Sequence, residues 1–171
     1  MKFAADPKVL RLKDPSAVTW GVVEPLWDDL PLTPFSKLNS FMAELSVGQR
    51  ALLALDWCQK EILNGGFLRL FYNGTGNLVP WAIDGAELVG AIPYGDLLKK
   101  AAAVLGAEYP LSATARRKAS ARLTSSQKRR LEKLEEGFID ALDAKSTDLG
   151  VTCARYVRGH PEQFVRGRRA G

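Results

Sequence analysis

The segment from residue 61 to 77, EILNGGFLRLFYNGTGN, combines four glycines with polar side chains that could hold a small ligand. The polar side chains are Glu61, Asn64, Arg69, Tyr72 and Asn73. Backbone N–H groups of glycine-rich turns bind anions, so one hypothesis is a small polar ligand at this NGGF…FYN turn. The glycine spacing matches neither a phosphate-binding loop nor the dinucleotide fingerprint. We favour a structural role, in which Asn64-Gly65-Gly66 ends a helix and Asn73-Gly74 forms a turn.

The segment from residue 116 to 130, RRKASARLTSSQKRR, carries seven positive charges and no acidic residue. Such a run attracts phosphates and other anions, which makes it a candidate anion-binding surface. The alternative, which we favour, is a solvated basic face that keeps the protein soluble. The candidate anion-binding residues are Arg116, Arg117, Lys118, Arg122, Lys128, Arg129 and Arg130.

Residue types used in catalysis and metal binding are scarce. His160 is the single histidine, which argues against a histidine-rich metal site and against a two-histidine acid–base pair. Cys58 and Cys153 fall on apolar helical stripes, and two cysteines make no disulfide framework. We therefore expect no catalytic residues, no metal and no cofactor, and a reducing, cytoplasmic setting.

The composition is that of one ordinary globular domain. Of the 171 residues, 46% are hydrophobic and 25% are charged. No stretch approaches the roughly 20 apolar residues of a membrane helix, so we expect no membrane association. The net charge of +5 is uneven: residues 1–110 carry a net −2, and residues 111–171 carry a net +7.

We predict that the segments that position these residues are helices, because apolar residues recur at helical spacing and strand signals are poor. We predict a single all-α domain of about seven or eight helices. Capping boxes begin helices at Ser46 and Thr124, and the helix over 47–63 should be central and buried on two faces. Asn77 and Asp96 are expected to cap two further helices, and Gly90 should end the first of them.

The chain divides into three predicted parts. Residues 1–33 form an N-terminal extension that packs on the domain. Residues 34–165 form the helical domain. Residues 166–171 form a frayed basic tail.

Three segments resemble the DNA-mimic protein nineteen family: DWCQKEILNGGF at 56–67, FYNGTG at 71–76, and ELVGA at 87–91. Weaker matches in the last helices extend the resemblance to roughly residues 17–165. The shared motif, which we interpret as structural, comprises Glu61, Asn64, Gly65, Gly66, Phe67, Phe71, Tyr72, Asn73 and Gly76.

The resemblance implies a compact helical domain of bacterial or phage type, located in the cytoplasm, with no catalytic residues and a role in protein binding. The name-giving member presents acidic side chains like duplex phosphates and occupies the DNA-binding face of a transcription factor. The net charge of +5 argues against such mimicry here, because like charges would repel a basic DNA-binding face.

We therefore expect a non-enzymatic protein-interaction module, such as a regulator or an immunity-like inhibitor, with an unidentified protein partner. The first alternative is a nucleic-acid-binding module that uses residues 116–130. The second is a small-ligand binder at the NGGF…FYN turn. The sequence leaves the oligomeric state open.

Overall fold

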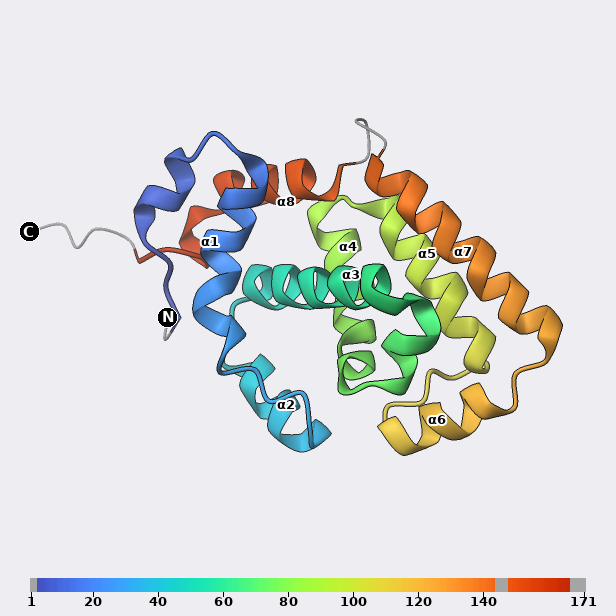
Figure 1. Cartoon of the computed structure of the whole chain (residues 1–171). Coiled ribbons are helices and arrows are strands. Elements are labelled where there is room, and N and C mark those ends of the chain that lie inside the picture. Colours follow the sequence, from blue (N-terminus) through green and yellow to red (C-terminus); the bar gives the residue numbers. More distant parts are fainter. Residues whose placement is uncertain (1–2, 144–147, 167–171) are drawn as a thin grey trace, which may run out of the picture.

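Eight α-helices make up most of the described residues, 3–143 and 148–166, in a computed structural model (Figure 1). These residues contain no strand, only an isolated bridge between Ala5 and Val165. The predicted all-α fold is confirmed. The helices are α1 (Pro15–Trp27), α2 (Phe35–Ala43), α3 (Val47–Tyr72), α4 (Val79–Val89), α5 (Ile92–Ala102), α6 (Ala113–Ala121), α7 (Ser125–Asp143) and α8 (Leu149–Gly159).

Helix α3 runs through the middle of the molecule and contacts α1, α4, α6 and α7 (Figure 1). Its N-terminus has the predicted capping box: Gln49 N donates to Ser46 Oγ at 3.1 Å, and Ser46 N donates to Gln49 Oε1 at 3.0 Å. Leu53 and Leu55 lie on different faces, yet they are 0% and 3% exposed. The prediction of a central helix covered on two sides is therefore confirmed.

A sharp kink divides α3 at Gly65 and Gly66. Gly66 has φ 73°, a value that a side chain disfavours, and Gly65 is extended at φ 177°. The prediction that the first helix stops here is confirmed, and Phe67–Tyr72 continues in a new direction as a short helical segment. The kink places the NGGF…FYN turn at the end of α3, beside α6.

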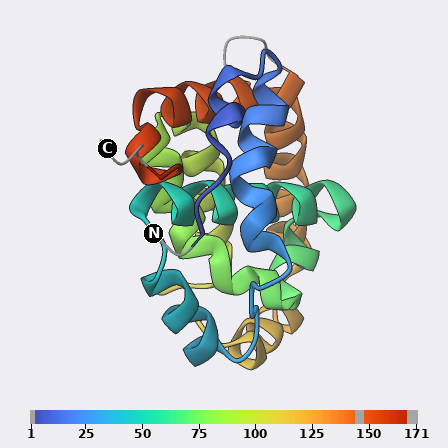
Figure 2. The ribbon, with the colours of Figure 1, turned by 90° about the vertical axis from the view of Figure 1, so that its left-hand side faces the viewer.

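The remaining helices surround α3. Helix α1 packs on α3 and α8. In Figure 2, α1 lies in front of α3, and α8 lies above α3. On the other side, α4 packs on α3, α5 packs on α4, and α7 packs on α5 and α3. At the α3–α4 crossing, a Cβ on Gly85 would lie 2.8 Å from Ala51 Cα, so the two helices approach closely. The two ends of the described chain also meet, since Ala5 N donates to Phe164 O at 2.8 Å.

Two predicted helix starts are wrong. Asn77 does not cap a helix; it lies in a 3-10 turn, Gly74–Leu78, and α4 begins at Val79 without a side-chain cap. Asp96 lies inside α5, which begins a turn earlier at Ile92 with Pro93 in its first turn. The predicted stop at Gly90 is confirmed by its left-handed φ of 83°.

The first 33 residues contribute to the same core. Val18, Val22, Val23 and Leu26 of α1 are at most 3% exposed. The domain boundary near residue 33 stays a prediction, and the predicted tail lies outside the described residues except for Arg166.

Candidate functional site

The carboxylate of Glu61 lies at the kink of α3 and accepts three side-chain hydrogen bonds. Oε1 accepts from Arg69 Nε and Asn73 Nδ2, both at 2.7 Å, and Oε2 accepts from Thr75 Oγ1 at 3.1 Å. Burial alone would raise the pKa of Glu61, but the hydrogen bonds and the Arg69 charge outweigh burial and hold it below the ordinary value of 4.5. One ionised carboxylate therefore joins both halves of α3 to the turn that follows.

Arg116 of α6 occupies the inside of the same turn and is 0% exposed. Its Nε donates to Phe71 O at 3.0 Å, and its Nη2 donates to Asn73 O at 3.1 Å. These carbonyls belong to the C-terminal end of α3, where a cation is favoured by the helix dipole. Its Nη1 donates to Asn77 Oδ1 and Leu111 O, both at 2.8 Å, and to Pro110 O at 3.2 Å.

The turn also closes around Gly76 and Asn77. Tyr109 Oη donates to Gly76 O at 2.8 Å, and Asn77 Nδ2 donates to Leu32 O at 2.8 Å. A Cβ on Gly76 would lie 2.6 Å from Arg116 Nε and 2.7 Å from Leu70 O. A glycine is therefore required at position 76, because the guanidinium of Arg116 packs directly against the backbone there.

This arrangement favours the structural interpretation of the motif. Phe67 and Phe71 are fully buried, while Asn64 and Tyr72 are exposed at its edge. The polar groups of Glu61, Arg69 and Asn73, which the ligand hypothesis requires, bind one another instead. We call Glu61, Arg69, Asn73, Thr75, Asn77 and Arg116 the turn hub.

The prediction that Arg116 belongs to an anion-binding surface is wrong, because its guanidinium is enclosed by carbonyl groups of the turn hub. Arg117 is exposed, but its Nε donates to Tyr72 O at 2.9 Å and its guanidinium lies 4.5 Å from the centre of the Tyr72 ring. Both residues thus hold the end of α3.

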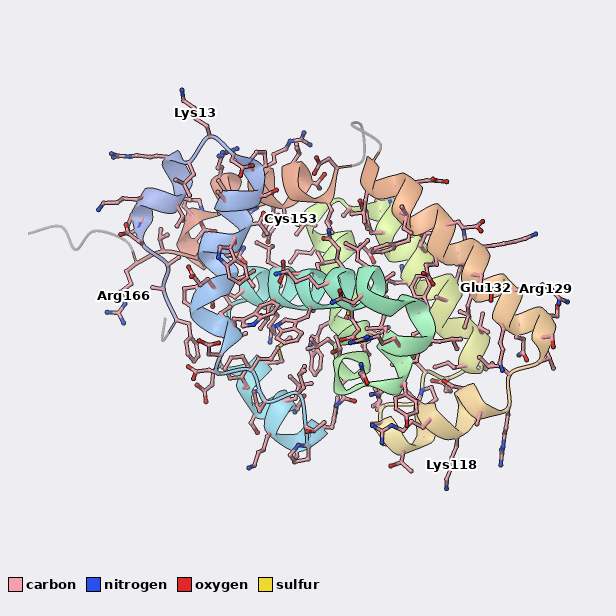
Figure 3. The ribbon with its side chains drawn as sticks, viewed as in Figure 1. Lys13, Lys118, Arg129, Glu132, Cys153 and Arg166 are labelled. Carbon is pink, nitrogen blue, oxygen red and sulfur yellow. The ribbon has the colours of Figure 1, made fainter. Side chains whose placement is uncertain are left out.

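The other five basic residues of the segment lie on the outside of the corner between α6 and α7. All five are exposed, and in the described part of the chain none of them pairs with a carboxylate. Figure 3 shows Lys118 and Arg129 pointing away from the body of the molecule in different directions. We call this surface the basic corner; it comprises Lys118, Arg122, Lys128, Arg129 and Arg130.

A second surface is a groove of about 600 Å³ between α1, α3, α7 and the start of α8. Its rim carries three apolar side chains that are well exposed: Trp20 at 39%, Leu63 at 52% and Ile139 at 41%. Exposed apolar side chains gathered in a concave site are typical of binding surfaces. We call this site the aromatic groove.

Lys60 lines the aromatic groove and is held by two tryptophans and a carboxylate. Its Nζ lies 4.4 Å from the centre of the Trp20 ring, 4.2 Å from that of Trp27, and 2.8 Å from Asp56 Oδ2. Trp27 in turn stacks on Trp57, with ring centres 4.0 Å apart. Cation–π contacts and an ion pair thus keep the Lys60 side chain against the groove wall.

Two carboxylates, Asp56 and Asp148, make the aromatic groove acidic. Burial raises the pKa of Asp56, and the hydrogen bond and charge of Lys60 offset this only in part. Asp148 caps α8, where its Oδ1 accepts from Val151 N at 3.0 Å. Burial, and to a smaller extent the charges of both carboxylates, raise the pKa of the buried Cys153 thiol to about 12.

The aromatic groove was not predicted as a site from the sequence. Its residues come from four helices, and only tertiary packing brings Trp20, Leu63 and Ile139 together. One local signal was present: Asp56 and Lys60 are four residues apart, so a helix pairs them.

Metal-binding clusters and membrane-spanning helices are the two features for which the described residues give a direct answer. Residues 3–143 and 148–166 contain no group of three or more His, Cys, Asp or Glu side chains placed to hold a metal ion. Within the same ranges, no helix has the length and apolar character needed to cross a membrane.

Comparison with known families assigns most of the chain to one family model. The family model described as DMP19-like protein matches residues 43–160, from the end of α2 to the end of α8. No curated protein and no solved structure matches the chain.

Proposed function

We propose that this chain, which belongs to the DMP19-like protein family, is a non-enzymatic protein-interaction module that binds its partner in the aromatic groove. The observation that carries the proposal is the exposure of Trp20, Leu63 and Ile139 around one concave site. Buried aromatic and aliphatic anchors supply much of the binding energy of protein interfaces.

The charges of the groove favour a partner with a basic side chain. Asp56 and Asp148 contribute two negative charges, and Lys60 contributes one positive charge that is held by Asp56 and the tryptophans. The groove therefore suits a partner segment that carries an apolar side chain beside a lysine or arginine. The apolar side chain would pack on Leu63 and Ile139, and the cation would lie near the carboxylates.

We further propose a regulator or immunity-like inhibitor in the bacterial cytoplasm. A module of this kind acts by covering part of its partner, and it needs no catalytic residue. The two buried free thiols, Cys58 and Cys153, suit a reducing compartment. Mimicry of DNA is not part of the proposal, because the net charge is +5.

The test compares proteins captured from extract of the source cell by the wild type and by a groove variant, Leu63→Gln with Ile139→Gln. This variant removes apolar contacts without changing the net charge. The matched control is Ile92→Gln with Leu111→Gln, two residues that are 50% and 49% exposed and lie outside the groove. Quantitative mass spectrometry should find a protein that the control retains and the groove variant loses.

Binding of the purified partner is then measured by calorimetry. Replacing a lysine or arginine in its bound segment by alanine should weaken binding by at least about tenfold. The proposal fails if the groove variant captures every protein that the wild type captures, or if no basic side chain of the partner contributes.

A further inference from the structure

We infer that the basic corner binds the phosphate backbone of duplex nucleic acid, as a second site separate from the aromatic groove. The corner has five exposed cations, and none of them pairs with a carboxylate in the described part of the chain. The nearest acidic residue along α7 is Glu132, which makes no ion pair with them. Unpaired cations gathered at one corner of the molecule create a positive potential that attracts polyanions.

Helix α7 places its charges against the preference of its own dipole. Lys128, Arg129 and Arg130 lie in its first two turns, and its last turn holds no basic residue. A helix favours acids near its N-terminus and cations near its C-terminus. The helix dipole therefore gives these three cations no stabilisation and disfavours Lys128 in the first turn, whereas Lys118 and Arg122 suit the end of α6. A local rule broken without a compensating contact is typical of functional surfaces.

The surroundings of the cations favour phosphates over an acidic protein. No large hydrophobic side chain between Ser112 and Phe138 is exposed, so the corner lacks the apolar anchors of a protein interface. Thr124, Ser125 and Ser126 lie exposed among the cations. Arg, Lys and hydroxyl groups are the side chains that contact nucleic-acid phosphates.

The corner also favours a duplex over a single strand. Binding of single strands relies on aromatic rings on which bases stack. Tyr72 is an exposed ring that contacts the segment, and the Arg117 guanidinium lies over it at 4.5 Å. If the bases do not stack on a ring, the corner binds nucleic acid through its phosphates, and these are regularly spaced in a duplex.

The corner is held rigidly on the fold. Arg116 fixes α6 to the end of α3, and Gln127 N donates to Thr124 Oγ1 at 3.3 Å where α7 begins. Five cations neutralise at most five phosphates, so affinity should fall by at most about 4.5 log units per log unit of salt. Between 50 and 200 mM salt, the upper limit is a loss of about 500-fold.

The test is fluorescence anisotropy of the full chain with a labelled 20-base-pair DNA duplex across that salt range. The probe variant is Arg129→Glu with Arg130→Glu, which places acids near the N-terminus of α7 and so does not threaten the helix. The matched control is Lys8→Glu with Lys13→Glu, two exposed lysines whose replacement changes the net charge equally. Figure 3 shows Lys13 at the opposite end of the molecule from Arg129. Labelled single-stranded DNA and polyglutamate serve as competing ligand classes.

We expect the wild type to bind the duplex at 50 mM salt. The slope of log affinity against log salt should correspond to two to five neutralised phosphates. The probe variant should lose at least about tenfold in affinity and about 1.8 units of slope, while the control stays within about threefold. Absence of wild-type binding at 50 mM salt would overturn the inference, and so would an equal loss in both variants. Tighter binding of polyglutamate would assign the corner to an acidic protein, and tighter binding of single strands would exclude the duplex.

Discussion

Arg116 is fully buried, and its guanidinium donates hydrogen bonds to neutral oxygens in place of a carboxylate. The acceptors are Phe71 O, Asn73 O, Asn77 Oδ1, Pro110 O and Leu111 O. Replacing it by methionine leaves several of these acceptors buried without a donor. We expect Arg116→Met to lower the free energy of unfolding by about 3 kcal/mol or more, measured in urea.

The neighbouring Arg117 is the matched control for Arg116. It is exposed, and one hydrogen bond and one ring contact hold it. Arg117→Met should therefore cost about 1 kcal/mol or less. Equal losses in the two variants would contradict the role given to Arg116 in the turn hub.

Glu61 makes the stability of the turn hub depend on pH. Its folded pKa is held below the ordinary value of 4.5, so its stabilising contribution is complete above that value and is lost as pH falls through the folded pKa. We expect Glu61→Gln to be less stable than wild type by about 1–2 kcal/mol at pH 7. The difference should shrink below pH 4.5, as measured by urea unfolding at several pH values. A difference that stays constant down to pH 3 would contradict the hydrogen-bond account.

At the scale of elements, the kink of α3 depends on Gly66. Its φ of 73° strains any side chain, and a Cβ would also overlap the carboxylate of Glu135 on α7. Gly90 is the control, since its φ is 83° and no atom lies within 4 Å of its Cβ position.

We expect Gly90→Ala to cost about 1–2 kcal/mol in the free energy of unfolding, from backbone strain alone. Gly66→Ala should cost at least about 1 kcal/mol more, because φ 73° with ψ −178° is a backbone region essentially restricted to glycine, whereas Gly90 has ψ 18°, and because the Cβ must also displace the Glu135 carboxylate. Adding Glu135→Ala to Gly66→Ala should recover part of that excess. Equal urea midpoints for the two glycine variants would contradict the extra cost at Gly66, and a double variant no more stable than Gly66→Ala would show that the contact with α7 does not matter.

The helix starts and stops that depend on residues close together in the sequence were predictable. The boxes at Ser46 and Thr124 and the stops at Gly66 and Gly90 each involve residues a few positions apart. Asn77 failed as a predicted cap because its side chain binds Leu32 and Arg116, which are distant in sequence. Local propensity cannot anticipate such competition.

The sites were less predictable than the helices, for the same reason. The sequence placed Arg116 and Arg130 in one basic run, yet the fold buries the first and exposes the second. A charge run has no signal for which member meets the carbonyls at the end of α3. The aromatic groove was missed entirely, because Trp20 and Ile139 meet only in the folded chain.

For the whole molecule, α7 connects the two proposed surfaces. Arg129 of the basic corner and Ile139 of the aromatic groove are ten residues apart, which is about 15 Å along the helix axis. No residue belongs to both surfaces. Sites at such a distance without shared contacts usually act independently.

The two surfaces should therefore respond to separate sets of substitutions. We expect the variant Leu63→Gln with Ile139→Gln to bind the DNA duplex within about twofold of wild type, because it leaves every cation in place. Conversely, Arg129→Glu with Arg130→Glu should capture the groove partner as well as wild type does.

Anisotropy and quantitative capture measure the two effects on the same four proteins: wild type, the two variants and their combination. The combined variant should lose both activities, each by the amount seen in the corresponding single-surface variant. If either variant impaired both activities, the two surfaces would form one continuous interface, and the partner would have to contact α7 along its length.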